Sequence, residues 1–167
     1  MALVLTLTGC TGAEPGAPAG FAPARDRPAA SEILFQNRSG DVLSLAAFRG
    51  QVVVLNLWAT WCTPCVQEMP ALERLQARVD PSWIAVVAVS VDRDPEKTDG
   101  FFRKHNLKNL QLSGFMDPSG AVMRDLRIRS LPTTVLVDPE GRELGRVEGP
   151  LDWDSPETVR WLESLYE

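Results

Sequence analysis

Two cysteines separated by two residues offer the clearest chemistry in this sequence. Cys62 and Cys65 stand in the segment Trp61-Cys62-Thr63-Pro64-Cys65, directly after an apolar run and at the start of a helical pattern. A helix N-terminus presents unpaired N–H groups and a partial positive charge, which favour the thiolate form of the first cysteine. Because a thiolate attacks a disulfide and a thiol does not, we expect Cys62 to be the nucleophile. Cys65, one turn further along, would then attack the mixed disulfide and release the product.

Three other interpretations explain this pair less well. A structural zinc site needs four ligands, and beside this pair the sequence offers one histidine, His105 in a polar helical stretch, and no second cysteine pair. A permanent disulfide around so small a loop would restrain little of the unfolded chain. Inert buried thiols would not normally stand at a helix start between Trp61 and Pro64. The pattern therefore favours disulfide exchange, in which the cysteines carry the electrons and neither a cofactor nor a metal is required.

The residues on either side of the pair predict the strand and the helix that must hold it. Residues 52–57 (VVVLNL) form a continuous apolar run, as expected of a strand covered on both faces. Pro64 suits the first helical turn, because the N–H that it lacks would be unpaired there. Pro70, in contrast, falls inside the helix and removes a backbone donor. The helix itself is predicted by apolar residues three and four positions apart, at Val66, Met69, Leu72, Leu75 and Val79.

The remaining sequence alternates between strand and helix patterns. Before the cysteines, apolar residues 33–35 and 42–45 flank a turn-rich cluster and predict a hairpin. After them, the sequence predicts a buried strand at 84–91, a helix at 95–105, a weaker strand at 110–115, a short helix at 121–126, strands at 133–137 and 144–147, and a final helix with Ser155 as its N-cap. This order predicts an α/β three-layer sandwich.

The first thirty residues resemble a targeting segment followed by a linker. Residues 2–8 are almost wholly apolar, too short to span a membrane, and could be the apolar part of a signal peptide. The segment Leu7-Thr8-Gly9-Cys10 resembles the bacterial lipobox, whose cysteine carries acyl chains that anchor a protein to a membrane. No basic residue precedes Arg25, whereas signal peptides usually begin with positive charge. The alternative is therefore an unmodified terminus with a free thiol at Cys10.

These features divide the chain into three parts. We expect residues 1–10 to be a lipoprotein-type signal segment that ends at Cys10. Residues 11–30, mostly Gly, Ala and Pro, have little to bury and should form a flexible linker. Residues 31–167 should form the folded domain, which is large enough for one hydrophobic core.

The active-site segment resembles a known family. Residues 54–70 (VLNLWATWCTPCVQEMP) resemble the corresponding segment of the TlpA/ResA-type branch of the thioredoxin family, and the order of elements supports this from about Ser31 to Glu167. The resemblance implies a thioredoxin-like α/β/α sandwich with an N-terminal β-hairpin and a central βα insertion around residues 110–120. That insertion is where we expect partner contacts.

A second segment resembles the cis-proline loop of the same family. Residues 130–134 (SLPTT) match it, which implies that Pro132 is cis, lies beside the disulfide and takes part in the reaction. The backbone of Leu131 would pair with an extended substrate. From the sequence alone, an ordinary trans turn remains the alternative.

Proton transfer to and from the buried cysteine requires a nearby side chain that can gain and lose a proton. Thioredoxins carry one six residues before the nucleophile, but that position here is Asn56, which cannot titrate. Glu68 follows Cys65 by three residues and shares its helix face. By resemblance, a glutamate at this place moves the proton of the buried thiol, and burial would raise its pKa into the useful range. The alternative is that Glu68 only favours the positive end of its helix.

Other side chains near the pair should meet the substrate. We expect Trp61 to shield the sulfurs and to offer an apolar surface, and we include Thr63, Pro64 and Leu131 in the substrate-binding set. Trp58 should instead pack in the core.

The charge of the chain and its distribution argue against some classes of function. The net charge is −5 and no Lys/Arg run is present, which argues against a nucleic-acid surface. The acidic stretch 92–100 lacks EF-hand spacing, so we assign no metal to it. The cysteine pair, the lipobox-like segment and the family resemblance together predict an extracytoplasmic thiol–disulfide oxidoreductase, anchored as a lipoprotein in the periplasm or on the outer face of the cytoplasmic membrane.

The resemblance also suggests partners. It implies a reductase of protein cysteines, such as those of apocytochrome c or of a copper site, with a membrane thiol reductase as electron donor. Two alternatives stay open: a general disulfide oxidase, and a non-catalytic binding module.

Overall fold

A single mixed sheet organises the protein. The computed structural model describes residues 16–108 and 114–166, and within them the strand order is β1-β8-β7-β4-β5-β6-β2-β3. The strands are β1 (Phe21–Pro23), β2 (Leu34–Gln36), β3 (Val42–Ser44), β4 (Val52–Trp58), β5 (Ile84–Ser90), β6 (Phe115–Met116), β7 (Thr133–Val137) and β8 (Glu143–Glu148). The helices are η1 (Leu45–Phe48), α1 (Thr63–Arg78), α2 (Pro95–Lys104), α4 (Ala121–Asp125) and α5 (Pro156–Glu163).

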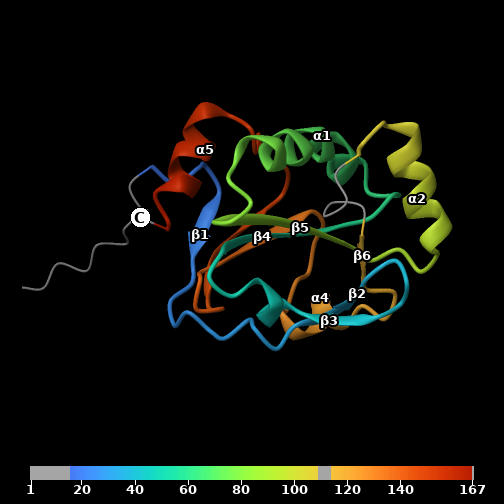
Figure 1. Cartoon of the computed structure of the whole chain (residues 1–167), viewed down its shortest axis with the longest axis horizontal. Helices are drawn as coiled ribbons and strands as arrows, with labels where there is room; N and C mark the ends of the chain where they lie inside the picture. Colours follow the sequence, from blue (N-terminus) through green and yellow to red (C-terminus); the bar gives the residue numbers. More distant parts are fainter. Residues whose placement is uncertain (1–15, 109–113, 167) are drawn as a thin grey trace, which may run out of the picture.

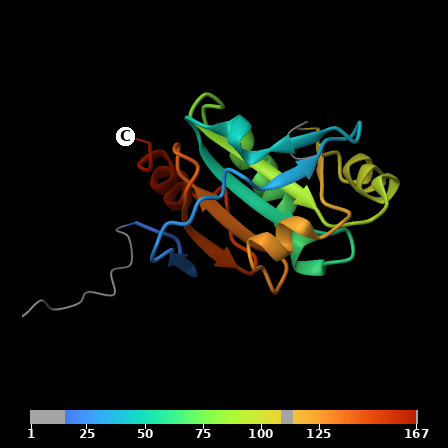
Figure 2. The same cartoon turned by 90° about the horizontal axis from the view of Figure 1, so that it is seen from below.

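Helices cover both faces of the sheet, as the predicted α/β/α sandwich requires. In Figure 1, α1 and α5 lie above the central strands and α4 lies below them. Figure 2, seen from below, shows α4 and the β2–β3 hairpin on this second face. The centre consists of β4, which pairs in parallel with β5 and antiparallel with β7. The thioredoxin-like architecture is confirmed.

The two faces of β4 supply two separate cores. Alternate residues of a strand point to opposite faces. Val52 and Val54 accordingly pack in the cluster that includes α1, Trp153 and the two cysteines, whereas Val53 and Leu55 pack with residues of the hairpin and α4. Every residue of β4 and β5 is buried, which explains why both strands are continuous apolar runs in the sequence.

The N-terminal hairpin is part of the main sheet. Gln36 of β2 pairs with Met116 of β6, and β6 in turn pairs in parallel with β5. The predicted strand at 110–115 is thus shifted to Phe115–Met116, while residues 110–113 lie outside the described part of the chain. The central insertion therefore connects the hairpin to the sheet.

The structure corrects the predicted linker for residues 16–30. Phe21–Pro23 form the edge strand β1, which pairs antiparallel with β8, and Ala30 is only 1% exposed. The physical reason is an aromatic anchor within the Gly/Ala/Pro-rich segment: the Phe21 ring packs edge-on against Trp161 at a centroid distance of 4.8 Å. Folded structure therefore begins before Ser31. Cys10 and the predicted signal segment lie outside the described residues.

Gly145 on β8 makes this close approach possible, which gives a first prediction. A Cβ at Gly145 would lie 2.5 Å from the Ala22 carbonyl oxygen and 2.5 Å from the Phe21 ring. We expect Gly145→Ala to displace β1 and to lower the free energy of unfolding by about 1–3 kcal/mol, measured by urea titration. Gly100→Ala is the control, because a Cβ in that helix meets nothing within 4 Å. Equal stability of the Gly145→Ala variant and the wild type would contradict the packing argument.

Candidate active site

The two cysteines stand where β4 gives way to α1. Cys62 is the N-cap of α1, and its Sγ accepts a hydrogen bond from the Cys65 N–H at 3.3 Å. The two residues are joined by a disulfide, with the Cα atoms 5.3 Å apart. Cys62 is 7% exposed and Cys65 is fully buried. This difference favours the predicted roles, because an incoming sulfur can reach only Cys62.

A buried carboxylate fixes the loop that precedes the cysteines. Asp92, just after β5, is 3% exposed. Its carboxylate accepts hydrogen bonds from the Thr60 N–H at 2.8 Å and the Thr60 hydroxyl at 2.9 Å, and from the Ser90 hydroxyl at 2.8 Å. Sequence reasoning considered Asp92 only as part of an acidic stretch. Its position directly after a buried strand parallel to β4 was the signal that could have placed it beside the site.

The two tryptophans near the site differ as predicted. Trp61 is 69% exposed, whereas Trp58 is fully buried and packs against Phe101 and Phe102. Thr63 is exposed and Pro64 is half-buried on the first turn of α1. These exposures leave Trp61, Thr63 and Pro64 available to a substrate, and their contact with one remains a prediction.

The proline loop has the backbone that the family resemblance implied. The Leu131–Pro132 peptide bond is cis, so the trans alternative is wrong. The loop is tied down on both sides: the Thr133 hydroxyl donates to the Ser130 carbonyl at 2.8 Å, and the Gly149 N–H donates to the Pro132 carbonyl at 2.9 Å. Leu131 packs against the apolar cluster that contains both cysteines. Pairing of its backbone with a substrate remains a prediction.

Glu68 is buried on α1, one turn after Cys65. It is 3% exposed. Its Oε1 accepts a hydrogen bond from Asn56 Nδ2 at 2.8 Å, and its Oε2 accepts from the Leu151 N–H at 3.2 Å and from Trp153 Nε1 at 3.1 Å. Burial raises the pKa of Glu68 above 4.5, and the three donors oppose the rise without cancelling it. Glu68 therefore keeps its proton to a higher pH than an exposed glutamate does.

A surface cavity connects Glu68 with solvent. Its volume is about 360 Å³. It lies between α1 and the chain that follows β8, and is lined by Gln67, Glu68, Ala71, Arg74, Pro150, Leu151 and Asp152. The buried carboxyl group can therefore exchange its proton with water away from the disulfide. Sequence reasoning missed residues 149–153 altogether, because no local pattern connects them with Glu68.

The pKa of Glu68 predicts a pH dependence of stability. The folded protein keeps the Glu68 proton to a higher pH than the unfolded chain, whose value is near 4.5. The resulting stabilisation is complete below pH 4.5 and is lost as the pH rises through the folded pKa. We expect the free energy of unfolding of the oxidised protein to fall over this range relative to Glu68→Gln. Urea titrations of both proteins at several pH values measure the difference, and a pH-independent difference would contradict the assignment.

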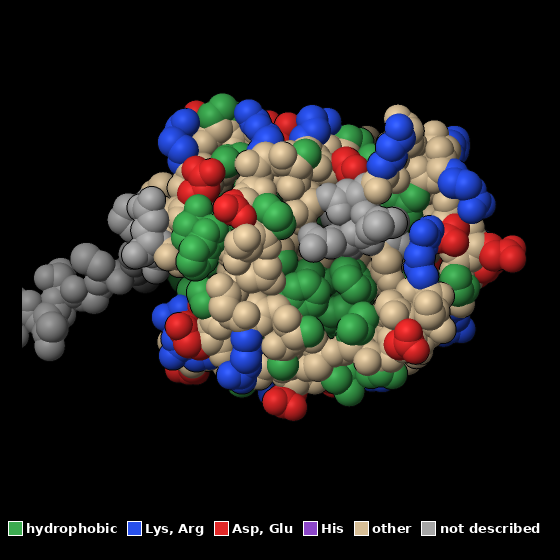
Figure 3. Space-filling view, viewed as in Figure 1, with side chains coloured by type: hydrophobic (Ala, Val, Ile, Leu, Met, Phe, Trp, Pro, Cys, Tyr) green, Lys and Arg blue, Asp and Glu red, His purple; other side chains and the backbone are tan. Residues whose placement is uncertain are grey.

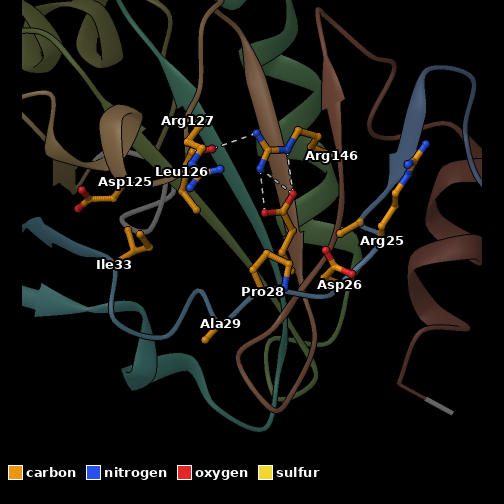
Figure 4. Close-up of a pocket in the computed structure, with 11 residues that line it drawn as sticks. Arg25, Asp26, Pro28, Ala29, Ile33, Asp125, Leu126, Arg127 and Arg146 are labelled. Carbon is orange, nitrogen blue, oxygen red and sulfur yellow. Dashed lines mark hydrogen bonds and ion pairs between the residues drawn. The ribbon is translucent and has the colours of Figure 1, made fainter.

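Another cavity lies elsewhere, and none of the predicted site residues lines it. It has a volume of about 530 Å³ and is bordered by residues 24–26, 28–29, 33 and 125–127 and by Glu143 and Arg146 of β8 (Figure 4). Arg146 there forms an ion pair with Glu143 at 2.8 Å and donates to the Leu126 carbonyl at 3.1 Å. Because Glu143 and the Leu126 carbonyl already occupy the Arg146 guanidinium, we assign no ligand to this cavity.

Other kinds of site find no support in the described residues. The structure shows no group of three or more His, Cys, Asp or Glu side chains placed to hold a metal ion in residues 16–108 and 114–166. In the same ranges, every helix is too short or too polar to cross a bilayer. Figure 3 shows basic and acidic side chains interspersed on the face that it displays.

The sequence around this site is similar to that of a known family and of several known proteins. Residues 27–142 match the family described as the AhpC/TSA family, a range that contains the cysteines, Glu68 and Pro132 but ends before Leu151 and Trp153. The thiol-disulfide oxidoreductase ResA of Bacillus thuringiensis subsp. konkukian is 27% identical over 120 residues, 72% of this chain and 68% of the relative. The thioredoxin-like protein YneN of Bacillus subtilis is 36% identical over 115 residues, 67% of this chain and 65% of the relative.

The chain also resembles a solved structure in its fold. The crystal structure of a putative thiol:disulfide interchange protein DsbE from Chlorobium tepidum superposes with a TM-score of 0.65 and 27% sequence identity. The match covers 83% of this chain and 92% of that one.

Proposed function

The chain belongs to the AhpC/TSA family and is a thiol–disulfide oxidoreductase, and from this premise we propose that it reduces disulfides of extracytoplasmic proteins. One observation carries the proposal: a reachable cysteine and a buried cysteine share the first turn of α1, and a buried carboxyl group with a raised pKa follows on the same helix face. Neither a metal nor an organic cofactor enters the scheme, because the cysteines carry the two electrons.

The reaction proceeds in two displacements. In the reduced protein, the Cys62 thiolate attacks one sulfur of the substrate disulfide; a mixed disulfide forms and the other substrate sulfur leaves as a thiolate. Cys65 then gives its proton to the Glu68 carboxylate and attacks the Cys62 sulfur. The Cys62–Cys65 disulfide forms, the second substrate sulfur leaves, and the substrate has gained two electrons.

The proposed partners fit this chemistry and the family resemblance of residues 54–70. The substrates in our proposal are proteins with oxidised cysteine pairs, such as apocytochrome c or a copper-site protein, and a membrane thiol reductase returns the electrons. Trp61, Thr63 and Pro64 would contact the substrate, and Leu131 would pair with its backbone.

The reduction potential of the Cys62–Cys65 pair tests the direction of transfer. The full chain is equilibrated in thiol–disulfide buffers and the reduced fraction is measured by alkylation. A potential close to that of thioredoxin, about −270 mV, supports a reductase. A potential close to about −120 mV would make the protein a general disulfide oxidase. A protein that never cycles, but keeps its partner when both cysteines are serine, would be a binding module.

Membrane attachment through Cys10 is part of the proposal. The support is the lipobox-like segment that ends at Cys10 and the apolar residues before it. We expect a palmitate analogue with a clickable alkyne to label the wild-type chain in bacteria and to leave Cys10→Ala unlabelled. Labelling of Cys10→Ala at the wild-type level would reject the lipid anchor.

A further inference from the structure

The Glu68 carboxyl group is held by residues from two distant parts of the chain. Asn56 on β4 donates to Oε1, while Leu151 and Trp153, both after β8, donate to Oε2. Asn56 Nδ2 carries two hydrogens and donates the other to the Thr134 hydroxyl at 2.9 Å. Oε1 thus has one donor, from β4, whereas both donors to Oε2 come from the segment that follows β8.

Trp153 provides the only side-chain donor to Oε2 among the described residues. The indole is fully buried and packs in the cluster that contains both cysteines. An indole has one N–H donor and no acceptor, and the N–H of Trp153 donates its hydrogen bond to Glu68. Burial alone does not require this arrangement: Trp58 is equally buried in the same cluster, and its Nε1 has no partner in the described part of the structure.

We propose that Trp153 is a positioning residue for Glu68, whose indole N–H holds Oε2 and thereby sets the proton affinity of this carboxyl group during disulfide exchange. This inference rests on the proposed proton transfer between Cys65 and Glu68. It assigns a role in the reaction to a residue that is separated from Glu68 by 85 positions in the sequence.

The physical basis is the balance between burial and hydrogen bonding. Burial favours the protonated carboxyl group, whereas each donor favours the carboxylate. Loss of the indole N–H therefore removes one interaction that opposes protonation. Two other charged side chains line the cavity beside Glu68: Arg74, which is paired with Asp154 at 2.6 Å, and Asp152. Cys65, in the preceding helical turn, is the group with which Glu68 would exchange its proton.

The test compares Trp153→Phe with a matched variant. Phenylalanine keeps most of the ring and removes the N–H. Trp58→Phe is the control, since it makes the same exchange at a buried indole that has no partner in the described structure. The oxidised full-length proteins are labelled with ¹³C at the glutamate carboxyl, and Glu68 is assigned by the resonance that Glu68→Gln lacks. The midpoint of its pH titration is then measured in each protein.

We expect the Glu68 midpoint to rise by about one pH unit in Trp153→Phe and to stay unchanged in Trp58→Phe. The pH profile of disulfide exchange should move by the same amount. An unchanged midpoint in Trp153→Phe, or equal shifts in the two variants, would overturn the inference.

A second measurement needs no change at Trp153. In the wild type, the Trp153 indole proton resonance should shift with the Glu68 midpoint, and in Glu68→Gln it should not titrate over that range. An indole resonance that ignores Glu68 would overturn the inference. Because both titrations use the oxidised protein without turnover, they can succeed when exchange fails, which separates this inference from the proposed function.

Discussion

Cys65→Ser should convert the protein into a trap for its substrate. Cys62 stays at the N-terminus of α1 and can still attack a disulfide, but the group that resolves the mixed disulfide is gone. We expect a covalent complex that survives denaturation without reductant and separates after reduction, detected by non-reducing electrophoresis and mass spectrometry.

Cys62→Ser is the matched variant for this experiment. It removes the reachable sulfur and leaves Cys65, which is fully buried, so we expect neither a complex nor measurable exchange. Disulfide reduction should fall by at least about 10³-fold in both variants, since the pair acts as a unit. Trapping by Cys62→Ser rather than by Cys65→Ser would reverse the assigned roles.

Glu68→Gln should slow the resolution step by about 100-fold. Positioned acid–base groups contribute about 10²–10⁴ in rate, and an amide cannot accept the Cys65 proton. The rate should also lose the part of its pH dependence that reflects Glu68. Stopped-flow Trp fluorescence of the reduced protein with a disulfide peptide measures both effects.

The control for this variant must separate proton transfer from stability. Glutamine would place an NH₂ group against donors from Asn56 or from Leu151 and Trp153, so we also expect a lower free energy of unfolding, by about 1–3 kcal/mol. Glu157→Gln on α5 removes an exposed carboxylate and should change neither rate nor stability. If Glu68→Gln exchanges at the wild-type rate while remaining folded, Glu68 has only a structural role.

The proposed proton path and the substrate face use different sides of α1. Trp61, next to Cys62, is largely exposed, whereas the cavity beside Glu68 lies between α1 and the chain after β8. A bound substrate can therefore cover the cysteines while Glu68 still exchanges its proton with water. In the proposed reaction, this separation would let Glu68 pass the Cys65 proton to water during the second displacement.

Short sequence patterns were enough to predict the strands, the helix start and the cap described above. The apolar runs at β4 and β5, the Cys-x-x-Cys pair at a helix start and the Ser155 cap are patterns within a few residues, so neighbouring side chains suffice to identify them. The family resemblance of two short segments added the architecture and the cis bond at Pro132. Glu68 could be chosen because it stands three residues after Cys65, on one helix face.

The residues that complete the site from distant parts of the chain could be identified only in the folded structure. Asp92 reaches Thr60 across 32 positions, and Trp153 reaches Glu68 across 85. Strand β1 likewise forms within a segment of linker composition. The Phe21 ring packs against Trp161, and the missing side chain of Gly145 allows β1 to approach β8 closely. These contacts join segments that only the packing of the sheet and its helices brings together, and hydrogen bonds or ring contacts of this kind leave no periodic signal in either segment.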